Sequence, residues 1–226
     1  MAGRTCGVSA LRVVAWVVLL LLVAAAPGCK KRPRPKGLPA QAGLTGGKIL
    51  FEDDFSKGAG NWELTSSNWK VVDGRLYTGD KPNDNKGAWL KEPALPADVR
   101  IEFTATSVKG NNPAFEGDIK SEFGGTNRAH ASGYIVIFGG WKNTLNTIAR
   151  GDEHGEGRLA VDAARRVEEG RTYRFALVRI GREIKWYLDG ELLLSVKDEA
   201  PATGGDFGFN NWNSRVYFDN VKVYSL

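Results

Sequence analysis

The sequence predicts an all-β domain, built as a sandwich of two antiparallel sheets or a jelly roll. Short apolar or alternating runs recur from residue 69 to residue 223, and several place residues of one kind at i, i+2 and i+4, as a half-buried strand requires. Asp73-Gly74 and Asp189-Gly190 each separate two such runs, which predicts hairpins because a type I′ turn needs positive φ at both central residues. The chain also has 28 glycines, and abundant turn residues between short strands are typical of sandwiches.

Helical periodicity is almost absent from the same region. From residue 48 onward, no stretch of ten or more residues sustains a 3.6-residue period. The segment from Val161 to Glu169 is long enough for one helical turn and no more. A Rossmann or TIM-barrel fold needs helices between its strands, so the sequence excludes both.

The first 28 residues have the pattern of an export signal that is removed. Arg4 and Arg12 supply positive charge, and the apolar run from Val13 to Ala26 has 14 residues, fewer than the ~18–20 that span a bilayer. The residues Pro27-Gly28 before Cys29 resemble the lipobox of bacterial lipoproteins. That resemblance implies cleavage before Cys29 and its acylation, which anchors a protein to a membrane. The alternative is an ordinary signal peptide followed by an unmodified cysteine.

Cysteine usage supports lipidation. The only other cysteine, Cys6, lies in the leader, so the mature chain offers Cys29 no intramolecular disulfide partner. An unpaired cysteine in an exported protein needs another role, and acylation supplies one. Lys30 follows Cys29 where an aspartate would signal retention at the inner membrane. By this sorting rule we expect the outer membrane of a Gram-negative bacterium.

Basic residues are concentrated before the domain. The chain has 31 Lys and Arg against 26 Asp and Glu, yet positions 1–36 hold no acidic residue and seven basic ones: Arg4, Arg12, Lys30, Lys31, Arg32, Arg34 and Lys36. This leaves 24 basic against 26 acidic residues from Gly37 onward, so nucleic acid is not an expected partner of the domain. Residues 29–47 form a Pro- and Gly-rich basic tether, which either contacts anionic headgroups or is a solvated spacer. Residues 48–226 form the domain.

Several strand-and-turn motifs carry a family resemblance. Three lie at the two ends of the domain, at Phe51–Phe55, Trp69–Leu76 and Val216–Val223, and two at its centre, Tyr173–Gly181 and Trp186–Gly190. Together they resemble concanavalin A-like jelly rolls, and more narrowly the laminin-G-like and 3-keto-disaccharide hydrolase-like modules of bacterial lipoproteins. The resemblance implies two curved antiparallel sheets and a concave face on which relatives bind or cleave glycans.

The segment Phe115–Phe123 carries four charges on one face of a predicted strand: Glu116, Asp118, Lys120 and Glu122. It resembles the catalytic strand of family-sixteen glycoside hydrolases, in which two glutamates act as nucleophile and acid/base. Six residues separate Glu116 from Glu122, or roughly 20 Å along a strand. A retaining pair needs about 5–5.5 Å and an inverting pair about 6.5–9.5 Å. The segment is therefore a glycan-contacting ladder, a salt-bridged surface ladder or, with a break in the strand, a catalytic pair.

The only two histidines, His130 and His154, are candidates for proton transfer. With Arg150 to neutralise a carboxylate, they would suit the β-elimination of uronic-acid glycans, as in jelly-roll polysaccharide lyases. The alternative is that both histidines are solvated loop residues. Asp152, between Arg150 and His154, is a further candidate to contact a ligand.

Trp141 and Trp212 are candidate platforms for sugar rings. Trp141 follows an apolar strand in Gly-Gly-Trp-Lys-Asn, with Asn143 placed to meet sugar hydroxyls, and Trp212 lies in an Asn-rich loop. Indoles stack on the apolar faces of sugars, but both residues also suit the core. Trp186, on the predicted central hairpin, is the tryptophan we expect inside.

A structural Ca²⁺ site is a further expectation from the family resemblance. In many concanavalin A-like folds the first and last strands pair, and carboxylates there bind this hard, oxygen-preferring ion. Asp53, Asp54 and Asp219 are the matching carboxylates. The sequence has no zinc-ligand spacing, because the mature chain has one cysteine and two histidines, and no phosphate-binding loop.

The sequence therefore predicts a cell-envelope lipoprotein that presents a glycan-binding domain to a poly- or oligosaccharide. The alternative is an enzyme acting at the concave face: a 3-keto-glycoside hydrolase, a family-sixteen-like hydrolase or a polysaccharide lyase. A third hypothesis is a structural envelope adaptor. Convergence of Glu116, Asp118, His130, Arg150 and His154 in one cleft would favour the enzyme.

Overall fold

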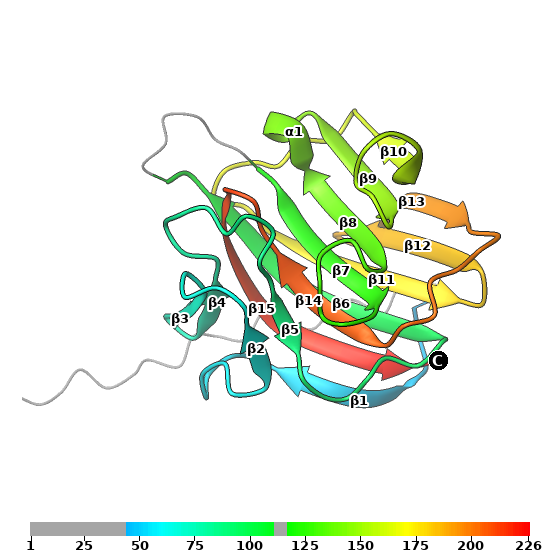
Figure 1. The fold of residues 1–226 in the computed structure, drawn as a ribbon, viewed down its shortest axis with the longest axis horizontal. Helices are drawn as coiled ribbons and strands as arrows, with labels where there is room; N and C mark the ends of the chain where they lie inside the picture. The colour runs from blue at the N-terminus through cyan, green and yellow to red at the C-terminus, as the bar shows by residue number, and fades with distance from the viewer. Residues whose placement is uncertain (1–43, 111–116) are drawn as a thin grey trace, which may run out of the picture. The chain divides into compact units, whose positions relative to one another are not determined.

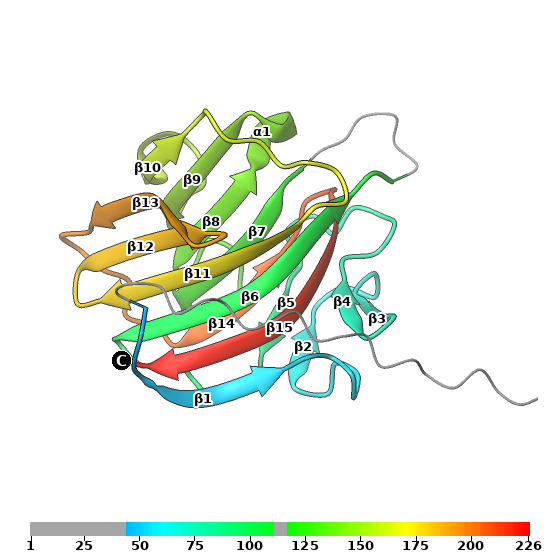
Figure 2. The same cartoon turned by 180° about the vertical axis from the view of Figure 1, so that it is seen from behind.

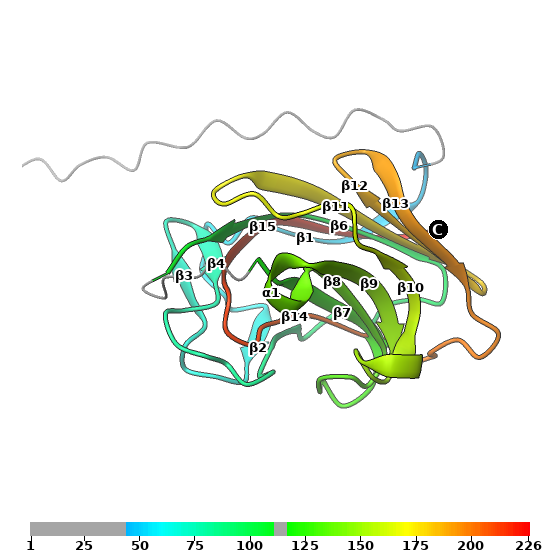
Figure 3. The same ribbon diagram turned by 90° about the horizontal axis from the view of Figure 1, so that it is seen from above.

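A computed structural model describes residues 44–110 and 117–226 and confirms the all-β prediction. Two antiparallel sheets face each other across one core, and Figure 3 shows them as two layers. The seven-stranded sheet lies toward the viewer in Figure 1, and the eight-stranded sheet does so in Figure 2. Cys29 and Glu116 lie outside the described residues.

In the eight-stranded sheet the order is β13-β12-β11-β6-β15-β4-β3, and β1 pairs with β15. Its strands are β1 (Lys48–Asp53), β3 (Lys70–Val72), β4 (Arg75–Tyr77), β6 (Val99–Val108), β11 (Thr172–Ile180), β12 (Glu183–Leu188), β13 (Glu191–Lys197) and β15 (Arg215–Ser225). The antiparallel pairing of β1 with β15 confirms that the first and last strands are neighbours.

The seven-stranded sheet has the order β10-β9-β8-β7-β14-β5-β2. Its strands are β2 (Trp62–Leu64), β5 (Ala88–Leu90), β7 (Ile119–Gly125), β8 (Tyr134–Gly139), β9 (Leu145–Arg150), β10 (Arg158–Asp162) and β14 (Asp206–Asn210). Two short turns, α1 (Gly140–Asn143) and η1 (Gly155–Gly157), interrupt the β8–β10 meander. The single helical turn expected between Val161 and Glu169 is wrong, because Val161 and Asp162 end strand β10 and the rest is irregular.

Both predicted Asp-Gly hairpins are present. Asp73 and Gly74 connect β3 to β4 with φ of 50° and 68°, and Asp189 and Gly190 connect β12 to β13 with φ of 48° and 101°. Positive φ at both central residues matches the right-handed twist of the flanking strands, so each pair fixes the register of its hairpin.

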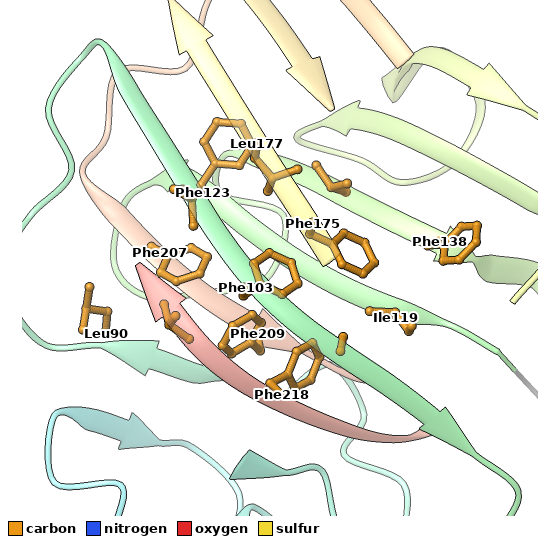
Figure 4. Packing of buried hydrophobic residues seen from close by; sticks show 14 of the residues in the cluster. Leu90, Phe103, Ile119, Phe123, Phe138, Phe175, Leu177, Phe207, Phe209 and Phe218 are labelled. Atoms are coloured by element: carbon orange, nitrogen blue, oxygen red, sulfur yellow. The ribbon is translucent and has the colours of Figure 1, made fainter. Parts of the chain in front are cut away.

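The core between the sheets is strongly aromatic (Figure 4). Phe209 of β14 stacks on Phe218 of β15 with ring centroids 4.0 Å apart, and Phe103 of β6 stacks on Phe175 of β11 at 4.7 Å. Trp186 has no exposed surface, as predicted, and stacks on the other side of Phe175. Large rings that interlock from both sheets hold the layers in a single arrangement.

The chain enters the domain on the outer face of the eight-stranded sheet. Leu44 is buried there against Ala176 and Val178 of β11, and Tyr187 of β12 packs beside them. This small apolar cluster is separate from the core and lies on the opposite side of the sandwich from the outer face of the seven-stranded sheet. Among the described residues no helix is long and apolar enough to cross a membrane.

Candidate functional site

The outer face of β7 carries two charges that water barely reaches. Ile119 and Phe123 point into the core, so strand alternation turns Lys120 and Glu122 outward, as the sequence predicts. Their exposed fractions are nevertheless only 1% and 2%. A charge buried to this degree needs a partner, and loops folded across the sheet supply the partners.

Two loops cover these charges. The β9–β10 loop brings Glu153 to 2.7 Å from the Lys120 ammonium. The β7–β8 loop brings His130 Nδ1 to 2.7 Å from Glu122 Oε1, while the backbone N–H of Ala131 donates to the other carboxylate oxygen. His130 Nε2 lies 3.9 Å from Glu153, so the two pairs form one charged cluster.

Beside this cluster lies a pocket of about 410 Å³. A volume of this size suits a small ligand or the end of a longer one, since such sites span about 300–1,000 Å³. Its lining combines aromatic, amide, cationic and carboxylate groups: Asn85, Asp118, Lys120, Ile137, Gly140, Trp141, Lys142, Glu153, His154, Trp212, Asn213 and Ser214.

One wall is a turn with an uncommon backbone. Trp141 and Lys142 of α1 both have left-handed dihedral angles, with φ of 51° and 59°, and Asn143 follows at 60°. This conformation costs a residue with a side chain about 1–2 kcal/mol relative to the right-handed region. The Asn143 amide offsets this cost, because it accepts a hydrogen bond from Val167 N–H and donates one to Val167 O, each at 2.8 Å.

The turn holds Trp141 over the outer face of the sheet. Its ring packs against the apolar cluster of β8 and β9, and the Arg158 guanidinium lies 4.0 Å from its centroid. His154 meets the indole edge-on, with centroids 5.7 Å apart. Left-handed backbone recurs on other walls of the pocket, at Asn85 (φ 60°) and Asp118 (φ 38°). Four residues of the pocket lining thus have positive φ, and strained backbone is common at ligand sites.

Trp212 occupies the β14–β15 loop and keeps 54% of its surface exposed. Buried amides fix the loop beneath it. Asn211 Nδ2 donates to Ser214 O at 2.7 Å, and Asn83 Nδ2 donates to Asn211 Oδ1 at 3.1 Å. Ser214 Oγ in turn donates to Asp118 O, which ties the loop to the residue before β7. The indole is thus exposed, but its backbone is held.

The pocket unites five of the residues singled out from the sequence: Asp118, Lys120, Trp141, His154 and Trp212. Glu122 and His130 lie next to it in the charged cluster. Glu116, the remaining charge of the predicted strand, lies outside the described residues.

Three other candidates make structural contacts away from the pocket lining. Asn143 is occupied by Val167, as described above. Asp152 accepts a hydrogen bond from His154 N–H at 2.9 Å and so shapes the β9–β10 loop. Arg150 shares a face of β9 with the core residue Ile148 and pairs with Asp198, so it points away from the pocket.

Asp198 is the centre of a buried polar cluster at the end of the sandwich. Burial alone would raise the pKa of its carboxyl. Hydrogen bonds from Ala200 N–H, the Tyr134 hydroxyl and the Arg150 guanidinium outweigh that effect and hold the pKa below its usual value. Burial and the neighbouring Asp198 carboxylate raise the pKa of Tyr134 to about 12, so Tyr134 stays a hydrogen-bond donor.

The three carboxylates considered for calcium do not form a metal-ligating group. Both oxygens of Asp53 accept protein hydrogen bonds, from Phe55 N–H and from the Asn61 and Trp62 side chains. Asp54 accepts two from Ser56. Within residues 44–110 and 117–226, no group of three or more His, Cys, Asp or Glu is placed to hold a metal ion.

Among the lining residues that sequence reasoning missed are Asn85, Lys142, Glu153 and Asn213. Lys142 and Glu153 are the sequence neighbours of the candidate residues Trp141 and His154, so their position in the sequence could have indicated them. Asn85 comes from the β4–β5 connection, where its Oδ1 accepts a hydrogen bond from Lys120 at 3.2 Å, and no periodic pattern points to it.

Comparisons with known proteins relate the chain to glycan-related proteins. A family described as a domain of unknown function (DUF6250) matches residues 126–221. An extracellular exo-alpha-L-arabinofuranosidase from Streptomyces chartreusis is 30% identical over 157 residues, which are 69% of this chain and 18% of that protein. The chain thus spans less than one fifth of the length of this relative.

Solved structures establish the fold. Carbohydrate binding module CBM66 from Bacillus subtilis is 20% identical over 73% of this chain and 96% of that chain, with a TM-score of 0.60. A Bacillus subtilis protein of unknown function with a galectin-like fold is 12% identical over 79% of this chain and 96% of that one, also with a TM-score of 0.60. The domain has the jelly-roll-like β-sandwich of galectins and carbohydrate-binding modules, as predicted.

The buried Asp198 cluster generates a prediction about acid stability. Because the pKa of Asp198 is lower in the folded protein than in the unfolded chain, its contribution is complete above pH about 4 and is lost as the pH falls further. Asp198→Asn should lower the free energy of unfolding at pH 7 by about 1–3 kcal/mol, and the deficit should shrink below pH 4. Urea unfolding from pH 7 to pH 3 measures it.

The neighbouring Glu199, whose carboxylate is exposed in surface ion pairs, supplies the matched control. Glu199→Gln should change the free energy of unfolding by less than about 1 kcal/mol at any of these pH values. An Asp198→Asn deficit that stays constant from pH 7 to pH 3 would contradict the assigned role.

Proposed function

We propose that this domain is a glycan-binding module whose ligand enters the pocket on the outer face of the seven-stranded sheet. The observation that carries the proposal is the pairing of an exposed indole, Trp212, with convergent polar groups in a pocket of about 410 Å³. A sugar ring has apolar C–H faces and a rim of hydroxyls, so its recognition needs both features. Indoles offer the apolar surface at a low cost in side-chain entropy.

The polar groups of the pocket match the hydroxyl rim. Asn85 and Asn213 offer amide donors and acceptors, Asp118 offers acceptors, and the Lys120 ammonium donates. The hydrogen-bonded loops and the strained turn fix these groups before a ligand arrives. Binding then costs little conformational entropy of the protein. This favours affinity for a polar ligand, whose interactions with the protein must compete with its interactions with water.

The comparisons support a binding module. The chain resembles less than one fifth of the arabinofuranosidase, as an accessory module of a longer enzyme would. The TM-score of 0.60 to CBM66 over nearly all of that module adds weight. Among the described carboxylates at the site, Glu122 and Glu153 are engaged by His130 and Lys120. A general acid or nucleophile must instead face its substrate, so this arrangement favours binding over hydrolysis.

The finer proposal is that the domain is displayed on a membrane surface through acylated Cys29. Three features of the sequence support this anchor: the export-signal pattern of residues 1–28, the single cysteine of the mature chain and the basic residues within positions 30–36. The chain joins the domain at Leu44, on the outer face of the eight-stranded sheet. The pocket lies on the outer face of the other sheet. By the Lys30 sorting rule, that membrane is the outer membrane of a Gram-negative bacterium.

Removal of the exposed indole tests the binding proposal. Trp212→Ala should weaken binding at least about tenfold, because tryptophans that become buried at the centre of a complex contribute about 2 kcal/mol or more to binding. Affinity electrophoresis through gels that contain arabinan, galactan or polygalacturonate measures retardation of the domain. The matched control is Ile180→Ala, since Ile180 has the same exposed fraction, 54%, and lies at the end of β11 in the other sheet.

Retardation by at least one polymer that Trp212→Ala abolishes and Ile180→Ala preserves is the expected outcome. If the wild-type domain migrates unhindered in a broad polysaccharide panel, or if the Trp212→Ala variant is retarded equally, the proposed site is wrong.

The anchor is tested on the full-length protein expressed in a Gram-negative host. The mass of the mature N-terminal peptide should show Cys29 as the first residue, carrying acyl chains, and the protein should sediment with membranes. Cys29→Ser should release it to the soluble fraction. An unmodified Cys29 thiol, or cleavage at another position, would contradict the anchor without affecting the glycan site.

A further inference from the structure

The charges around the pocket are not evenly distributed. On its floor, Lys120 and Glu153 neutralise each other at 2.7 Å. At the wall formed by the α1 turn, Lys142 lines the pocket next to Trp141. Arg158 is not one of the lining residues, but its guanidinium lies 4.0 Å from the centroid of the Trp141 ring. Within the described part of the chain, neither cation forms an ion pair with a carboxylate.

Arg158 is fixed in this place by its backbone contact. Its Nε donates to Glu153 O at 2.9 Å, which leaves the terminal nitrogens of the guanidinium beside the indole. The stacking on Trp141 orients the guanidinium plane, and a guanidinium held in this way is prepared to bind a carboxylate.

Lys142 is held in a conformation that its side chain does not favour. Its φ of 59° and ψ of 45° suit glycine, and its side chain is exposed. Glycine at this position would relieve the strain and fold at least as well. The presence of a lysine at a strained pocket wall therefore points to a role in binding rather than in folding.

Asp118 lies on the pocket wall formed by the start of β7, and its backbone joins that wall to the β14–β15 loop through Ser214. The pocket thus has a carboxylate from Asp118 and, on the neighbouring α1 turn, the ammonium of Lys142. A ligand that complements both carries hydroxyls as well as an anionic group.

We infer that the pocket selects a sugar that bears a carboxylate, such as a hexuronic acid, with the carboxylate placed at Lys142 and the hydroxyls directed to Asp118 and the pocket amides. This inference rests on the proposed glycan binding and adds the chemical class of the ligand. The Lys142 ammonium and the nearby Arg158 guanidinium contribute long-range attraction, and the indoles contribute the apolar surface.

A pair of polymers that differ only in charge tests the inference. Polygalacturonate and its fully methyl-esterified form have the same backbone, but the ester removes the negative charge. We expect the wild-type domain to bind polygalacturonate at least about fivefold more tightly in affinity electrophoresis, and added salt should reduce this difference because exposed charges are screened.

Lys142→Gly and Lys142→Gln should lose most of that preference while keeping the binding that Trp212 supplies. Lys142→Gly should also melt at the same temperature as the wild type or higher, which separates lost binding from lost folding. Lys197→Gln, at an exposed lysine on β13 in the other sheet, is the matched control and should leave the preference unchanged.

The outcomes separate the two proposals. Equal binding of both polymers by the wild type, or a preference that Lys142→Gly and Lys142→Gln retain, would overturn the choice of an acidic sugar and leave glycan binding intact. Absence of binding to these and all other polysaccharides would overturn the glycan-binding proposal itself.

Discussion

The buried ion pair between Lys120 and Glu153 determines how the outer face of the seven-stranded sheet is built. Strand alternation forces Lys120 outward once Ile119 and Phe123 enter the core. An ammonium with 1% exposure is costly unless it is paired, so the β9–β10 loop must fold back over the sheet to deliver Glu153. The same loop carries His154 to Trp141, and its position thereby closes one side of the pocket.

The strained α1 turn defines a second side of the pocket. The two hydrogen bonds between Asn143 and Val167 hold its residues in the left-handed conformation. The sequence had suggested Asn143 as a ligand contact. The side chain therefore acts through Trp141 and Lys142, as a positioning residue. The aromatic core, with Phe103 and Phe209 at its centre, keeps the two sheets rigid. The loop and the turn are both attached to this rigid support.

Much of the fold could be predicted because it depends on local patterns. The Asp73-Gly74 and Asp189-Gly190 turns, the outward direction of Lys120 and Glu122, and the buried Trp186 all follow from turn chemistry or from a period of two. These patterns depend on residues that are close together in the chain, so the local structure that they predict is found in the folded protein.

The site could be predicted only in part, because its partners are remote in sequence. Arg150 resembled a ligand-binding cation until Asp198, 48 residues away, proved to be its partner. Asn85 accepts a hydrogen bond from Lys120, which is 35 residues away in sequence, and no sequence pattern predicts that the two residues meet. The left-handed turn at Trp141 follows from tertiary contacts with Val167, so propensity alone could not reveal it.

Sugar binding in the pocket between Trp141 and Trp212 can be followed directly through the indole N–H signals of the domain. In a titration of ¹⁵N-labelled protein with a short oligosaccharide of the polymer that retards it, the Nε1–H signals of Trp141 and Trp212 should shift in a saturable manner. Those of Trp62, bonded to Asp53, and of the core residue Trp186 should stay in place. Shifts at Trp62 or Trp186 with none at Trp141 and Trp212 would contradict the account.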